Sequence, residues 1–109
     1  ELGVFVKDGK IIFNPRLLRE SEFVKTPKTF NYTAISKEEK SINLKEGSLC
    51  FTYCQVPIVY SLSNKNCIEV VFNDNSNVVF DSLSLDEVTS TEVFNRTNKI
   101  NHIKVSIIK

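Results

Sequence analysis

The feature that most constrains the fold is a set of short apolar segments with a period of two. Val4 and Val6 alternate with other residues near the start, and Ile103, Val105 and Ile107 do so near the end. Successive side chains of a strand point to opposite faces, so this period gives each strand one buried face. Several such segments separated by polar turns predict an all-β fold, an antiparallel two-layer β-sandwich of about eight strands.

Composition fits one globular domain. The chain has 109 residues, 41% of them hydrophobic and 25% charged, and a net charge of +1 with no basic cluster. We therefore expect no nucleic-acid partner, because nucleic-acid binding needs a concentrated basic face. No apolar run approaches the ~20 residues that cross a bilayer, so we expect no membrane span. The chain contains no methionine, and we interpret residues 1–109 as a single domain that forms part of a longer protein.

Two hairpins are predicted in the first half. Asp8-Gly9 stands between apolar runs and supplies the positive-φ positions of a tight type I′ turn. Asn14-Pro15 should end the second strand, and residues 16–23 then read as a crossover. Phe30 to Ala34 and Ile42 to Leu44 form the second hairpin, with the charged run 36–41 as its turn.

The most apolar segment runs from Gly47 to Leu62. Both of its faces look buried, which is typical of a central strand. Pro57 makes one continuous strand unfavourable, so we place a bend, bulge or edge there.

Two strands and a helix are predicted before the closing strand. Cys67 to Phe72 and Val78 to Phe80 are the strands, with a turn over residues 74–77. Thr89 followed by Glu92 matches a capping box, which predicts one short helix near residues 89–96.

The chain contains three cysteines, an odd number. Cys50 and Cys54 lie four residues apart, about 13 Å along a strand, which is too far for a disulfide. Cys67 could meet one of them across strands, but we expect three reduced thiols and, from them, a weak preference for a cytoplasmic location. The sequons at Asn31 and Asn95 matter only in a secreted, glycosylated protein.

Candidate catalytic and metal-binding groups are few. His102 is the only histidine; the period of two places it on the solvent side of the last strand, although a cysteine–histidine hydrolase would have to use it. Residues 74–77 are rich in oxygen ligands but lack the glycine and distal glutamate of a calcium loop, so we interpret them as a solvated turn. We expect no catalytic residue, no cofactor and no metal site.

Paired carboxylates and aromatic rings are the remaining candidates. Glu69, Asp81, Asp86 and Glu87 could supply two carboxyl groups for glycoside hydrolysis, but nothing in their spacing favours it. Three tyrosines are candidates for contact with a glycan or a partner, because sugar rings stack on aromatic faces. They are Tyr32, Tyr53 and Tyr60.

Two stretches resemble a known family. They run from Phe13 to Phe23 (FNPRLLRESEF) and from Gly47 to Tyr60 (GSLCFTYCQVPIVY). Together they resemble the C-terminal β domain of large bacterial carbohydrate-active proteins of the cellobiose-phosphorylase-like type, which are built around an (α/α)6 toroid. In such proteins the catalytic carboxylates lie in the toroid, and the terminal β-sandwich packs against it or against a partner subunit.

The resemblance implies a non-catalytic accessory domain of a glycoside hydrolase or phosphorylase. Its partner would be the catalytic (α/α)6 domain of the same polypeptide or a partner subunit, with glycan as a further possible contact. The alternative is an independent carbohydrate- or protein-binding β-sandwich module, acting through an exposed strand edge or an aromatic patch.

Overall fold

The computed structural model describes residues 3–14 and 26–108. It contains nine strands and one short helix, so the all-β prediction is confirmed. The crossover proposed for residues 16–23 lies outside the described residues. In chain order the elements are β1 (Val4–Lys7), β2 (Lys10–Phe13), β3 (Lys28–Thr33), β4 (Glu39–Leu44), β5 (Ser48–Tyr53), β6 (Val56–Ser63), β7 (Cys67–Phe72), β8 (Asn77–Phe80), α1 (Glu87–Phe94) and β9 (Ile100–Ile108).

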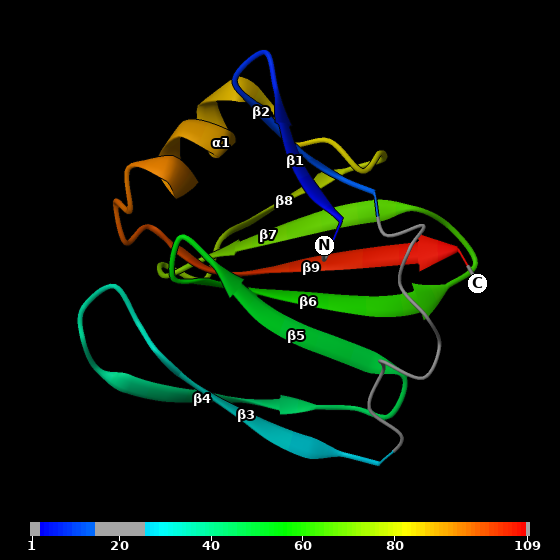
Figure 1. Cartoon of the computed structure of the whole chain (residues 1–109), viewed down its shortest axis with the longest axis vertical. Helices are drawn as coiled ribbons and strands as arrows, with labels where there is room; N and C mark the ends of the chain where they lie inside the picture. Colours follow the sequence, from blue (N-terminus) through cyan, green and yellow to red (C-terminus); the bar gives the residue numbers. More distant parts are fainter. Residues whose placement is uncertain (1–2, 15–25, 109) are drawn as a thin grey trace.

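Five strands form the main sheet, in the order β5-β6-β9-β7-β8, and β1-β2 and β3-β4 are separate hairpins (Figure 1). The prediction of antiparallel pairing holds for every pair except one. β6 and β9 run parallel, with Ile58 opposite Ile103. A parallel neighbour needs a long connection, and here β7, β8 and α1 lie between the two strands in the chain.

The core lies on one face of the main sheet. The hairpin β1-β2 and the helix α1 supply its other side, and the β2 residue Phe13 is 2% exposed. A short extended segment before α1 continues the β2 pairing: the Phe13 N–H donates to the Leu83 carbonyl at 2.7 Å, and the Leu85 N–H donates to the Ile11 carbonyl at 2.9 Å. The buried cluster comprises Ile11, Phe13, Val56, Ile58, Tyr60, Ile68, Val70, Leu85, Val93, Ile100, Ile103, Val105 and Ile107.

The predicted turn at Asp8-Gly9 is present. Both residues have positive φ, 54° and 75°, and Lys7 pairs with Lys10 across it. The second hairpin is also present, but its turn is shorter than predicted because β4 already begins at Glu39.

The apolar run from Gly47 to Leu62 is two strands, and the break falls before Pro57. Cys54 and Gln55 form a tight turn with φ of 50° and 64°, and Tyr53 pairs with Val56 across it. Pro57 continues β6 opposite Thr52. In a hairpin with a two-residue turn, the second pair of residues from the turn, here Thr52 and Pro57, exchanges no hydrogen bonds. The missing N–H of Pro57 therefore removes no hydrogen bond between β5 and β6.

The helix was predicted with the wrong cap. It begins at Glu87, and its N-cap is Asp86, whose side chain accepts a hydrogen bond from the Thr89 N–H at 2.8 Å. Thr89 is instead a buried residue of the first turn. Both aspartate and threonine are good N-cap residues, and the Thr89-x-x-Glu92 pattern predicts Thr89 as the cap instead of Asp86.

A register shift in β9 re-aims one side chain. Val71 pairs with His102, whereas its neighbour Phe72 pairs with Ile100, so Asn101 is the extra residue of a β-bulge. Bulges break the strict alternation of a strand. As a result Ile100 and Ile103 are both buried although they are three residues apart, and Asn101 contacts Asn73 at the start of the β7-β8 turn.

Candidate functional site

The three tyrosines singled out from the sequence do not form one surface. Tyr60 is 0% exposed, and its ring meets those of Phe13 and Phe51 edge-to-face at 6.2 and 5.2 Å between centroids. Burial raises the pKa of its hydroxyl. A ring enclosed in this way cannot stack on a glycan, so Tyr60 is corrected from a candidate contact to a core residue.

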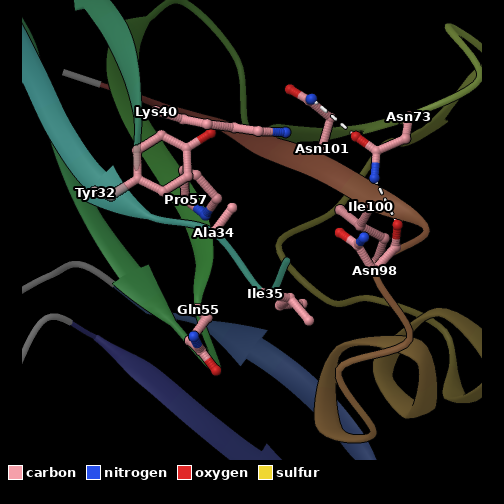
Figure 2. Close-up of a pocket in the computed structure, with 10 residues that line it drawn as sticks. All are labelled: Tyr32, Ala34, Ile35, Lys40, Gln55, Pro57, Asn73, Asn98, Ile100 and Asn101. Carbon is pink, nitrogen blue, oxygen red and sulfur yellow. Dashed lines mark hydrogen bonds between the residues drawn. The ribbon is translucent and has the colours of Figure 1, made fainter. Parts of the chain in front are cut away.

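Tyr53 and Tyr32 lie on opposite faces of the main sheet. Tyr53 is half-buried against the main core. Tyr32, on β3, is half-buried beside Pro57 (Figure 2), and its pKa is raised by burial and by the neighbouring Cys50 thiol. Tyr32 also stacks with Phe30, with 6.2 Å between ring centroids and 22° between ring planes. Tyr32 therefore remains a candidate contact residue, in company with Phe30.

The cavity beside Tyr32 is too small for an organic ligand. Its lining runs from Tyr32, Ala34 and Pro57 to Asn73 and Asn101 (Figure 2). The volume of this cavity is only about 10 Å³, which is about the space that one water molecule needs.

His102 and Cys67 lie apart on the main sheet. His102 is half-buried rather than on an open face, and its Nδ1 is 2.7 Å from the Asn101 Oδ1. Burial, and then Lys104, lower its pKa, while Glu69 opposes them. Cys67 lies four residues along β7 from Val71, the residue opposite His102, or about 13 Å.

Cys50 is a poor nucleophile for a physical reason. It is buried, and burial raises the pKa of its thiol to about 11. With this pKa, Cys50 stays protonated at neutral pH. Because the thiolate is the reactive form, the protonated thiol is a poor nucleophile. All three cysteines are free thiols, as the sequence predicted.

Glu69 and the α1 carboxylates fall on different sides of the sheet, and Asp81 is exposed in the connection between β8 and α1. Glu69 points away from the core, accepts a hydrogen bond from Asn77 Nδ2 at 2.6 Å and lies 4.0 Å from Lys104. Asp86 and Glu87 begin α1 on the core side, where Asp86 caps the helix. Glu69 and the α1 carboxylates thus cannot flank one scissile bond. Among residues 3–14 and 26–108, no three histidine, cysteine, aspartate or glutamate side chains gather as a metal-binding group.

A groove at the end of β7 is large enough for a small molecule to enter. Its volume is about 380 Å³, and small-molecule pockets measure about 300–1,000 Å³. It is formed by the β7-β8 turn and the segment that enters β9. The lining residues are Phe72, Asn73, Asp74, Ser76, Asn98 and Lys99.

Asn73 joins the two walls of this groove. Its backbone N–H donates to the Lys99 carbonyl at 2.8 Å, and its Nδ2 donates to the Asn98 carbonyl at 2.5 Å. Its Oδ1 accepts from Asn101 Nδ2 at 2.9 Å, the side chain re-aimed by the β-bulge (Figure 2). Every polar atom of the Asn73 amide is thus occupied in holding the walls together.

The turn itself was found from the sequence, but the groove was not. Residues 74–77 were expected to form a solvated turn, and Asp74 does bind its own turn through the Ser76 N–H at 2.9 Å and the Ser76 hydroxyl. These bonds lower the pKa of Asp74. Asn98 and Lys99 carry no local signal that would place them beside this turn. Their only sequence signal is polarity just before an apolar strand.

Two edge strands expose large apolar side chains. On β1, Phe5 and Val6 are 53% and 52% exposed, and on β8, Val79 is 56% exposed. β1 pairs only with β2, and β8 only with β7, among the described residues. These edges are two of the exposed apolar surfaces available for contact with another polypeptide; Val88 on α1, 73% exposed, and Ile108 on β9, 58% exposed, are others.

Comparison with known proteins gives no family assignment. No model of a known protein family matches the chain, and no curated protein is significantly similar to it in sequence. The one helix in the described residues, with eight residues, is too short and too polar to cross a membrane.

Proposed function

We propose that this chain is a non-catalytic accessory β domain of a bacterial carbohydrate-active enzyme of the glycoside hydrolase or phosphorylase type. In this proposal it packs against the catalytic (α/α)6 domain of the same polypeptide or against a partner subunit. The carbohydrate context is supported by the resemblance of its two sequence stretches, the second of which folds as the β5-β6 hairpin.

The observation that carries the packing role is the exposure of apolar side chains on edge strands. Free edges in proteins that act alone are usually blocked by charged residues, proline or bulges. β8 has the sequence NVVF, with neither charge nor proline, and its Val79 is 56% exposed. Exposed apolar side chains on an unblocked edge favour contact with another polypeptide.

The test compares hydrogen exchange in the chain alone and in the full-length protein that contains it. Packing through the edges slows exchange of the β8 or β1 amides in the full-length protein, while the amides of β4, whose outward face is polar, serve as the control. Equal exchange rates at both edges in the two proteins would contradict the packing role. Hydrolysis or phosphorolysis of β-glucosides by the purified chain alone would contradict the non-catalytic role.

A second candidate function is an independent carbohydrate- or protein-binding module. The stacked pair of Phe30 and Tyr32 on β3 favours it, because aromatic rings are common contacts for sugars and for protein partners. Replacing both residues with alanine separates the two candidates. Loss of binding to a glycan or protein by a chain whose edge-strand exchange is unchanged supports the independent module.

A further inference from the structure

We propose that the groove between the β7-β8 turn and the Asn98–Lys99 segment binds a neutral saccharide. This goes beyond the proposed function, because a domain that only packs against an enzyme needs no ligand of its own. The argument rests on the rigidity of the groove, on the chemistry of its lining and on its charge.

The groove walls are held in place before any ligand binds. Three hydrogen bonds of Asn73, to Lys99, Asn98 and Asn101, tie the β7-β8 turn to the entry of β9. The turn is closed independently by the two bonds from Ser76 to Asp74. A fixed site loses little conformational entropy on binding, which favours the binding of a small ligand.

The lining offers the two kinds of contact that a sugar ring uses. Phe72 is half-buried, packs against the core and contributes apolar surface to the groove, and apolar ring surface suits the CH face of a pyranose. Asp74, Asn98 and Lys99 supply acceptors and donors for hydroxyl groups.

The charges favour a neutral ligand over an ionic one. Lys99 is the single cation of the lining, and its Nζ lies 3.7 Å from Glu92. Asp74 adds a carboxylate whose pKa is lowered by its own turn, so a phosphate or carboxylate ligand would meet a like charge. A polyhydroxyl ligand can use the carboxylate and the ammonium together without a net charge of its own.

The test is a titration of the 15N-labelled chain with methyl β-D-glucopyranoside and methyl β-D-galactopyranoside, followed by NMR. We expect saturable shifts of the amides of residues 72–76 and 98–99 with at least one of the two sugars, and none with sodium phosphate at equal ionic strength. Shifts with phosphate alone, shifts confined to other residues, or no saturable shift with either sugar would overturn the assignment.

A matched pair of variants tests the groove directly. Asn98 and Asn75 both have positive φ, 64° and 73°, so glycine suits the backbone at either position. Only Asn98 lines the groove. Loss of one neutral hydrogen bond should weaken sugar binding by Asn98→Gly by about 3- to 10-fold, whereas Asn75→Gly should bind as the natural chain does. Equal affinities of the two variants would contradict the proposal.

These outcomes are independent of the packing role. Sugar binding in the groove can fail while the β8 amides are still protected in the full-length protein, and the reverse can also occur. The groove lies at the β7-β8 turn, and the exchange test is read on the strand amides of β8 and β1.

Discussion

The hydroxyl oxygen of Ser90, on α1, accepts a hydrogen bond from the backbone N–H of Ile11, on β2, at 2.9 Å. Ser90 is 0% exposed and Ile11 1% exposed. The bond joins residues 79 positions apart in the sequence, and it satisfies a buried donor that would otherwise lack a partner. This contact ties the helix to the first hairpin over the core, beside the bond from the Leu85 N–H to the Ile11 carbonyl.

Ser90→Ala should therefore lower the free energy of unfolding by about 1–3 kcal/mol, the cost of leaving a buried N–H unsatisfied. Thr91→Ala is the control, since it removes a hydroxyl from the next position of the same helix, where the side chain is exposed. It should change stability by less than about 0.5 kcal/mol. Urea denaturation followed by circular dichroism measures both, and equal stabilities of the two variants would contradict the role of Ser90.

The helix cap provides a second prediction. Asp86→Ala should destabilise the chain by about 1 kcal/mol, because it removes the acceptor for the Thr89 N–H. Asp86→Asn should retain most of the stability, since asparagine caps helices nearly as well as aspartate. Asp81→Ala changes an exposed aspartate of the same connection and is the control. If Asp86→Ala behaved like Asp81→Ala in thermal denaturation, Asp86 would not be the cap.

Local chemistry explains which parts of the fold could be predicted. Asp8-Gly9 was recognised as a turn because glycine and aspartate tolerate positive φ. The turn at Cys54-Gln55 was missed because neither residue type prefers positive φ and apolar residues flank it on both sides. There the pairing of β5 with β6 imposes the backbone conformation, a tertiary effect that a short window of sequence does not contain.

Long-range pairing explains the remaining differences. The parallel contact between β6 and β9 and the bulge at Asn101 depend on which strands become neighbours. The same applies to the candidate groove. Asn73 follows β7 and Asn98 precedes β9, so these residues, 25 positions apart in the sequence, meet because β7 pairs with β9. The sequence identified the turn at residues 74–77, but it could not show what lies beside that turn.

The buried thiol gives a prediction for pH. Burial raises the pKa of Cys50 to about 11, from an ordinary value of 9.0. The folded state then holds this proton more tightly than the unfolded state, so the contribution of Cys50 to stability is complete below about pH 9 and is lost as the pH rises towards about 11. Cys50 should also react slowly with iodoacetamide at pH 8, because little thiolate is present.

Mass spectrometry of the alkylated peptides checks this prediction. Modification of Cys50 should lag behind that of the half-buried Cys54 and Cys67, and all three should react at equal rates in urea. A Cys50 that reacts as fast as the other two in the folded chain would show that its thiol is accessible. The effect of pH on stability is read as the difference in unfolding free energy between the natural chain and Cys50→Ala at pH 8 and pH 10.5, since the titration of Tyr60 is common to both.

The first hairpin carries the last prediction, because it presents two phenylalanines in opposite environments. Phe13 is 2% exposed and packs edge-to-face against Tyr60, whereas Phe5 is 53% exposed on the edge strand β1. Phe13→Ala should cost about 3–5 kcal/mol through lost burial and the cavity left beside Tyr60. That is a large share of the 5–15 kcal/mol that holds a typical domain folded, so part of the population should unfold at 37 °C.

Phe5→Ala is the matched control, since it removes the same ring from the same hairpin. It should change the free energy of unfolding by less than about 1 kcal/mol in the chain alone, because only part of the ring is removed from water. If Phe5→Ala were as damaging as Phe13→Ala, the core would not lie on the Phe13 side of the hairpin. If instead Phe5→Ala were harmless to the chain alone but destabilised the full-length protein, the exposed ring would be a contact with another domain, as the proposed packing role requires.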